Sequence, residues 1–233
     1  MVQLGLTEAQ EDRAKELHAK AMIINGHDST VAIPKPTQGY IIPHFDDRYY
    51  AKLSSGGLPC LVLSIPERWD DHGEAIQKIS KFYAVLEKYE KMYSLVSTAD
   101  DIARIKSEGR VPVIIGFQTG SKAIDDDPAL LSVFHRLGLR VMQLTYQNRT
   151  SAGDGCAERF DGGLSRFGID VVRKMNRVGV VIDLAHSSRR TFLDAIEFSE
   201  DPVCYTHGGV RALCDNNRNV DDEQIQTLAE KGG

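Results

Sequence analysis

The sequence has few cysteines and no arrangement of them that is typical of a disulfide framework or a zinc knuckle. Four cysteines are spread over 233 residues, and no CxxC pair occurs among them. Cys60 and Cys204 lie inside apolar strand patterns, so we expect reduced, buried thiols. Cys156 lies instead in the polar loop Gly-Asp-Gly-Cys-Ala-Glu. A thiol there could contact a substrate, although a structural thiol is the simpler interpretation.

The sequence also lacks an excess of basic residues and a long apolar run. Its 28 lysines and arginines are outnumbered by 33 aspartates and glutamates, which gives a net charge of −5. With no basic cluster to contact a phosphate backbone, we expect no nucleic-acid partner. No segment approaches the roughly 20 apolar residues that span a bilayer, and residues 1–18 lack the apolar core of a signal peptide. We therefore expect a cytoplasmic protein with no membrane span.

What the sequence does contain is a repeated alternation of short apolar runs and longer segments of helical period. The predicted strands are Ala21 to Asn25, Cys60 to Ile65, Val111 to Phe117, Arg140 to Thr145, Val178 to Leu184 and Val203 to Thr206. The predicted helices are Asp70 to Leu95, Pro128 to Leu137, Leu164 to Val178, Ser188 to Ser199 and Asp221 to Lys231, with a further one in residues 1–18. Strand followed by helix, repeated, predicts parallel strands joined by right-handed crossovers.

This pattern predicts an α/β protein of the (β/α)₈ TIM-barrel type, organised as a single domain over residues 1–233. Such barrels typically need about 250 residues. The final Ala-Glu-Lys-Gly-Gly is typical of a helix end, after which another strand would follow, so we expect one or two strand–helix units to lie outside this chain. The proline-punctuated segment Asp28 to Gly57 is equally consistent with a substrate wall and with a plain surface excursion.

Three histidines lie where the chain is predicted to leave a strand: His27, His186 and His207. A lone histidine at a strand end is usually a hydrogen-bonding or core residue. In a barrel, however, side chains at the C-terminal ends of different strands converge on one mouth, and neutral imidazoles gathered there are typical zinc ligands. We expect His18, His72 and His135 to be exposed or packed in helices, while His44 could reach the mouth from its loop.

Three further residues could contact a substrate at the same mouth. Arg218, just before the last predicted helix, could hold a substrate carboxylate in bidentate fashion, or could equally cap a loop or pair with Asp215. Gln118 and Tyr146 follow the third and fourth predicted strands. Each could polarise a carbonyl or simply close the top of the core.

Four motifs together resemble the membrane dipeptidase, or renal dipeptidase, family of zinc peptidases. They are Val-Val-Ile-Asp-Leu-Ala-His-Ser-Ser (180–188), Pro-Val-Cys-Tyr-Thr-His (202–207), Arg-Ala-Leu-Cys-Asp-Asn-Asn-Arg-Asn-Val (211–220) and Leu-Gly-Leu-Arg-Val-Met-Gln-Leu-Thr (137–145). The resemblance covers most of the chain from Val111 onward and the first strand.

The resemblance implies a metal-dependent barrel that hydrolyses dipeptides with two zinc ions, which share a bridging carboxylate and activate a water. By position, His186 and His207 correspond to ligands of one zinc and His27 to a ligand of the other. Arg218 corresponds to the group that holds the dipeptide carboxylate. These four residues match the family by type.

Three positions depart from the family pattern. Ser29 stands where the first motif has an aspartate, Gln118 replaces the bridging glutamate, and Tyr146 replaces a histidine thought to stabilise the oxyanion. A neutral amide cannot offset the repulsion between two divalent ions, so we expect one or two zinc ions, with the second weakly held. Asp28 could replace the missing ligand only if the strand backbone were irregular there.

We therefore predict a dipeptidase-like metallohydrolase that cleaves dipeptides or a related small amide with a free carboxylate, as a homo-oligomer. In this reading Gln118 and Tyr146 are the catalytic candidates. Two alternatives stay open. One is a barrel rebuilt for another reaction on a small carboxylate, with Arg218 as the anchor and Cys156 or Tyr146 taking part. The other is a catalytically silent binding protein of the same fold.

Overall fold

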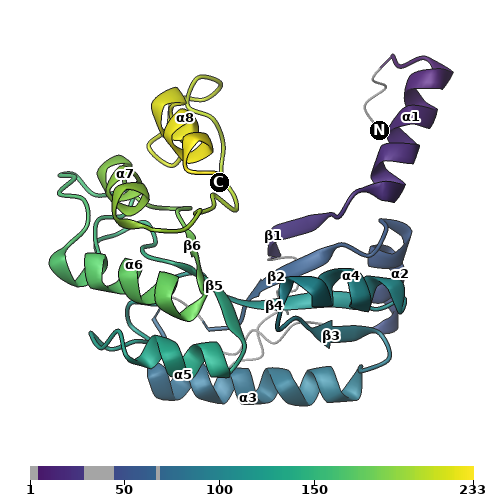
Figure 1. Ribbon diagram of the computed structural model, residues 1–233, viewed down its shortest axis with the longest axis horizontal. Helices are drawn as coiled ribbons and strands as arrows, with labels where there is room; N and C mark the ends of the chain where they lie inside the picture. Colours follow the sequence, from purple (N-terminus) through teal and green to yellow (C-terminus); the bar gives the residue numbers. More distant parts are fainter. Residues whose placement is uncertain (1–4, 29–44, 67–68) are drawn as a thin grey trace.

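The computed structural model describes residues 5–28, 45–66 and 69–233, and within them six strands form one curved sheet. The strands are β1 (Ile24–Asp28), β2 (Cys60–Ser64), β3 (Tyr93–Leu95), β4 (Val111–Phe117), β5 (Leu139–Gln143) and β6 (Val181–Asp183). The order is β1-β2-β4-β5-β6, and β3 pairs with the first residues of β4. Every pairing between these strands is parallel, so their C-terminal ends lie at the same edge of the sheet (Figure 1).

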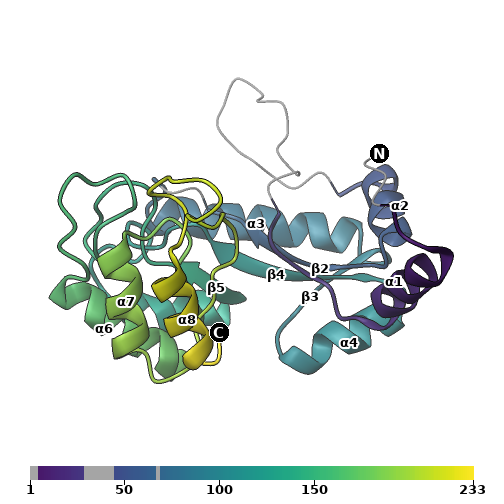
Figure 2. The same ribbon diagram turned by 90° about the horizontal axis from the view of Figure 1, so that it is seen from above.

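Helices connect the strands and form an outer layer. They are α1 (Glu8–Lys20), α2 (Asp47–Ser55), α3 (His72–Lys88), α4 (Ala99–Ser107), α5 (Leu130–Arg136), α6 (Arg166–Val178), α7 (Arg189–Phe198) and α8 (Asp222–Glu230). Helices α6, α7 and α8 follow one another around one end of the sheet, whereas α1 stands away from it and buries no residue (Figures 1 and 2). Polar N-caps such as Ser165 and Asp221 accept backbone N–H bonds and fix where α6 and α8 begin.

The strands bury side chains on both faces because successive residues point to opposite sides. In β2, Leu61 and Leu63 belong to the large core that packs against α3, α5, α6 and α7. Cys60 and Val62 belong to a smaller cluster that includes Ile105 of α4. Val62 also lines a small cavity with His27 and other polar residues at the C-terminal strand ends. The polar site therefore lies on the face of the sheet opposite the large core.

The sheet curls so that its two ends approach each other. Cys204 forms an isolated parallel bridge with Asp183 and extends the sheet beyond β6. At the other edge, a Cβ added to Gly26 would lie 2.9 Å from the carbonyl oxygen of Thr206, so only a glycine permits this approach of β1 to the 203–206 segment. The described residues thus form a parallel α/β half-barrel. A closed eight-stranded barrel and a single-domain organisation stay predictions.

Several predicted boundaries are wrong. The segment Asp70 to Leu95, predicted as one helix, ends its helix at Lys88, turns, and enters strand β3. The apolar periodicity continues across that turn because both the helix and the strand contribute to the same core. The segment Val203 to Thr206 forms only the bridge at Cys204. Helices α2 and α4 and strand β3 were not predicted, and β6 begins later than expected because α6 continues to Val178.

The first strand was also placed too early. It covers Ile24–Asp28, so His27 lies within β1 and not after it. The pairing of β1 with β2 shifts register between Asn25 and Asp28, which is the irregular backbone that a substitute carboxylate would need. The Asp28 side chain, however, accepts a hydrogen bond from the hydroxyl of Tyr49 in α2. None of the helices in the described ranges combines the length and apolar character needed to span a bilayer.

Candidate active site

Three histidines from separate parts of the chain meet at the C-terminal edge of the sheet. The rings of His27 and His207 are stacked, with centroids 4.4 Å apart. The rings of His186 and His207 lie at 63° with centroids 5.0 Å apart, and their Nε2 atoms are separated by 3.0 Å. The convergence predicted from the sequence is therefore present, and it brings the Nε2 atoms of His186 and His207 within hydrogen-bonding distance of each other.

His27 faces Gln118, the residue that follows β4. The side-chain nitrogen of Gln118 lies 3.3 Å from Nε2 of His27. A cavity of about 10 Å³, room for roughly one water molecule, is bounded by these two side chains together with Asp183 and Gln143. Gln118 thus lies where a side chain can act on the His27 side of the site, but it offers a neutral amide.

Tyr146 and Cys156 surround His186. The Tyr146 ring is stacked on the His186 ring, with centroids 4.1 Å apart. The backbone N–H of Cys156 donates to the carbonyl of His186 at 2.8 Å. That bond helps to hold His186 at φ = 67°, a left-handed conformation that costs energy for a residue with a Cβ and that is common at functional sites.

A buried polar network, which the sequence analysis did not identify, supports His207. Asp183 accepts hydrogen bonds from the Gln143 amide at 2.9 Å and from the Thr206 hydroxyl at 2.6 Å. The Thr206 oxygen lies 2.8 Å from Nδ1 of His207. The available signal was an aspartate inside the otherwise apolar run Val-Val-Ile-Asp-Leu-Ala, because a buried acid requires polar partners.

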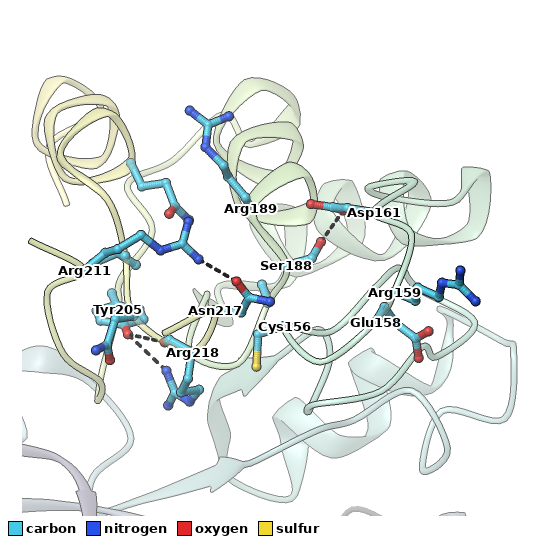
Figure 3. A pocket seen from close by; sticks show the side chains of 14 residues that line it. Cys156, Glu158, Arg159, Asp161, Ser188, Arg189, Tyr205, Arg211, Asn217 and Arg218 are labelled. Carbon is cyan, nitrogen blue, oxygen red and sulfur yellow. Dashed lines mark hydrogen bonds between the residues drawn. The ribbon is translucent and has the colours of Figure 1, made fainter. Parts of the chain in front are cut away.

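Arg218 connects the histidines to a second cavity, larger than the one beside His27. Its guanidinium donates to the His207 carbonyl at 2.8 Å and to the Tyr205 hydroxyl at 3.0 Å. It lines a cavity of about 240 Å³ together with Cys156 and Ser187 (Figure 3). This volume lies just below the roughly 300–1,000 Å³ of sites for drug-sized ligands, so it suits a smaller molecule. The alternative pairing of Arg218 with Asp215 does not occur, because Asp215 lies instead near Arg211.

Burial favours the neutral form of His27 and His207, because it lowers the pKa of both. It lowers the pKa of His207 to about 4, with a contribution from the neighbouring His27, and it also lowers the pKa of His27. A neutral imidazole is the form that binds a metal ion. Burial acts in the opposite direction on Cys156, whose pKa it raises, so this thiol is not activated as a nucleophile.

The two halves of the site differ in how well they would hold a metal ion. Two nitrogens bound to one zinc at about 2.0–2.1 Å in tetrahedral geometry lie roughly 3.3 Å apart, close to the separation of the His186 and His207 Nε2 atoms. That distance also suits an N–H···N hydrogen bond in the metal-free protein. Within the described ranges, no three His, Cys, Asp or Glu side chains are grouped so that they could hold a metal. The His186–His207 pair therefore offers two nitrogen donors at a separation that suits one ion, and Gln118 offers no carboxylate that could bridge to a second.

The remaining candidates lie away from this centre. His18 and His72 are exposed, and His135 is half-buried in α5, as predicted. Ser29 and His44 lie outside the described residues.

Comparison with known proteins agrees with this geometry. The model of the family described as membrane dipeptidase (peptidase family M19) matches residues 11–233. The chain belongs to the membrane dipeptidase family. It is 30% identical over 160 residues to Dipeptidase verJ of Clonostachys rogersoniana, covering 68% of this chain and 41% of that protein. It is 32% identical over 166 residues to Dipeptidase 3 of Rattus norvegicus, and this match covers 68% of this chain and 33% of that protein.

Solved structures of other proteins share the fold. An amidohydrolase from Pseudomonas aeruginosa superposes with a TM-score of 0.82 at 30% identity, covering 94% of this chain and 62% of that chain. A second structure is a metallo peptidase from Rhodobacter sphaeroides, liganded with a phosphinate mimic of the dipeptide L-Ala-D-Ala. It superposes with a TM-score of 0.74 at 20% identity, and the match covers 91% of this chain and 72% of that chain. The second likeness shows the fold alone. The chain spans about two fifths or less of the curated membrane dipeptidase relatives named above.

Proposed function

We propose that the protein is a metal-dependent hydrolase that cleaves the amide bond of dipeptides or related small amides, using one zinc ion at His186 and His207. The observation that carries this proposal is the 3.0 Å approach of their Nε2 atoms in a member of the membrane dipeptidase family. A bound zinc ion would lower the pKa of a water to about 7 and polarise the scissile carbonyl. We propose further that the half-barrel sheet belongs to a closed eight-stranded barrel.

The chain's own residues would bind and orient the substrate. Arg218 lines the larger cavity and already donates to the His207 carbonyl, so a carboxylate held by its guanidinium would lie close to the histidine pair. The hydrogen bonds of the Arg218 guanidinium in the described part of the chain are to neutral oxygens, the hydroxyl of Tyr205 and the carbonyl of His207. Its charge is thus available to a substrate carboxylate.

Tyr146 and Gln118 would act on the reacting amide from opposite sides of the histidines. Tyr146 is stacked on His186, which places a phenol O–H beside the pair, where it could donate to a developing oxyanion. Gln118 lies beside His27 and could hydrogen-bond to a carbonyl or a water through its amide.

The first test combines metal analysis with a substrate panel. Zinc per chain is measured by mass spectrometry on protein purified without chelator, and hydrolysis of a small dipeptide panel is measured with and without added zinc. We expect about one zinc per chain and zinc-dependent hydrolysis that requires a free substrate carboxylate. Absence of both zinc and hydrolysis would reject the proposal and favour a rebuilt or silent barrel. Homo-oligomerisation and a cytoplasmic location stay predictions from the sequence.

A further inference from the structure

A buried carboxylate, that of Asp183, lies beside the site, and none of the proposed roles uses it. It is 3% exposed and lies at the end of β6, where it pairs with Gln143 of β5 on one side and with Cys204 on the other. Its carboxylate accepts four hydrogen bonds: from the Gln143 amide, the Ala185 N–H, the Thr206 N–H and the Thr206 hydroxyl. An ionised carboxylate only accepts hydrogen bonds, and these four donors satisfy its hydrogen-bonding capacity.

Thr206 is held by two of those bonds. Its N–H donates to one Asp183 oxygen at 3.1 Å and its hydroxyl to the other at 2.6 Å. A hydroxyl has a single hydrogen, so once it points to Asp183 the oxygen can only accept from a third group. That group is Nδ1 of His207, at 2.8 Å. The Nδ1 atom must therefore carry the imidazole proton.

From this geometry we propose that Thr206 and Asp183 are positioning residues, which hold His207 in the Nδ1–H tautomer and leave the lone pair of Nε2 directed at His186. The inference deepens the proposed function because it identifies what selects the metal-binding nitrogen. Groups that accept a hydrogen bond from the far nitrogen of a ligand histidine orient the ring and make it a better ligand. The same tautomer allows His186 to donate to His207 across the 3.0 Å separation in the metal-free protein.

The first experiment reads the tautomer directly in the metal-free full chain. Nitrogen NMR of histidine-labelled protein is recorded at about pH 8, above the ordinary imidazole pKa, with the His207 signals assigned by loss in His207→Asn. The wild type and Thr206→Ser, which keeps the hydroxyl, should show protonated Nδ1. Thr206→Val, which removes the hydroxyl at similar volume, should shift His207 toward the Nε2–H form. Thr206→Ala serves the same purpose if the valine variant fails to fold.

The matched control is Thr119→Val. Thr119 is 4% exposed and its hydroxyl makes no hydrogen bond within the described structure, so this change removes a buried hydroxyl without breaking such a bond. We expect the His207 tautomer and the zinc affinity to be unchanged in this variant.

The second experiment measures zinc affinity by competition with a chromophoric chelator. Thr206→Val should weaken zinc binding about 10- to 100-fold, the usual loss when a ligand histidine loses its outer partner, and Thr206→Ser should retain it. An unchanged tautomer in Thr206→Val would overturn the inference, as would an equal loss of affinity in Thr206→Ser and Thr119→Val. Failure of the wild type to bind zinc would instead reject the proposed function, and the NMR result would still decide the roles of Thr206 and Asp183.

Discussion

The two halves of the site place histidines in opposite kinds of surroundings. On one side His186 and His207 bring their nitrogens within 3.0 Å, and His207 is backed by Thr206 and the buried Asp183. On the other side His27 faces the neutral amide of Gln118 across a cavity with room for about one water. The first half has a close imidazole pair with a supporting hydrogen-bond network, whereas on the second side a neutral amide, and not a carboxylate, lies beside Nε2 of His27.

We infer from this difference that bringing imidazoles together is not sufficient to build a two-metal site. Two divalent ions a few ångströms apart repel each other strongly, and a carboxylate between them offsets that repulsion where an amide cannot. All three histidines lie at the C-terminal edge of the sheet because the strands are parallel. The side chains between the histidines then determine how many ions can be held.

The largest expected effect comes from removing the ligand pair. His186→Ala or His207→Ala should abolish zinc retention and reduce hydrolysis by more than the roughly 10- to 100-fold typical of losing an outer partner. His27→Ala should cost less, because its Nε2 atom faces Gln118. Zinc content and kcat/KM are measured for all three, with His72→Ala, an exposed residue at the start of α3, as the control. Equal losses in His27→Ala and His186→Ala would show that the two halves are equivalent.

The next effect separates substrate binding from metal binding. Arg218→Ala should raise KM about 10- to 100-fold for dipeptides with a free carboxylate, as expected from losing a charged hydrogen bond worth ~1.5–3 kcal/mol. Zinc content should be unchanged, and so should hydrolysis of substrates with an amidated C-terminus. Arg190→Ala, an exposed arginine of α7 that pairs with Asp194, is the control. A fall in kcat without a change in KM would contradict the anchoring role.

Gln118→Glu tests the comparison between the two sides of the site by placing a carboxylate beside His27. A carboxylate beside His27 should raise the zinc content above that of the wild type, toward two ions per chain at saturating metal, because it would offset the repulsion between ions. Titration followed by metal analysis measures the stoichiometry. Gln118→Ala, which removes the amide without adding charge, should leave it unchanged. If Gln118→Glu also left the stoichiometry unchanged, the amide would not be what limits the second ion.

The smallest effect is expected at Cys156. Burial raises the pKa of this thiol, so it is uncharged at neutral pH, and Cys156→Ala should retain zinc content and kcat/KM. The structural contribution of Cys156 is its backbone N–H, which donates to His186 and which alanine preserves. Loss of activity in Cys156→Ala together with retained activity in His186→Ala would support a rebuilt site with different chemistry.

The sequence predicted those parts of the fold that repeat a local pattern. Helices α6, α7 and α8 were found from three-and-four apolar spacing and their polar N-caps, and β4 was found with its observed bounds. Strand β3 was missed because a three-residue strand after a turn is too short to interrupt the periodicity of α3. The nine-residue helix α4 that follows it was missed as well.

His186 and His207 were proposed as site residues from their positions at predicted strand ends, and Arg218 from its position just before the last predicted helix. The supporting residues were not. Asp183 and Thr206 lie about 20 positions apart, and their hydrogen bonds depend on how the segment after α7 returns beside β6. No local sequence pattern predicts that Asp183 and Thr206 lie within hydrogen-bonding distance of each other.

The amino-acid sequence by itself determined which groups are available: three imidazoles, one guanidinium, and an amide and a phenol that follow predicted strands. It also determined the parallel α/β class, since strand–helix alternation leaves few other topologies. Only the tertiary structure decided that His186 and His207 form the close pair, that His27 faces Gln118, and that Asp183 and Thr206 orient His207. The physical reason is that hydrogen bonds and metal coordination act over about 3 Å, whereas residues far apart in the sequence reach that range only through strand register and the curl of the sheet.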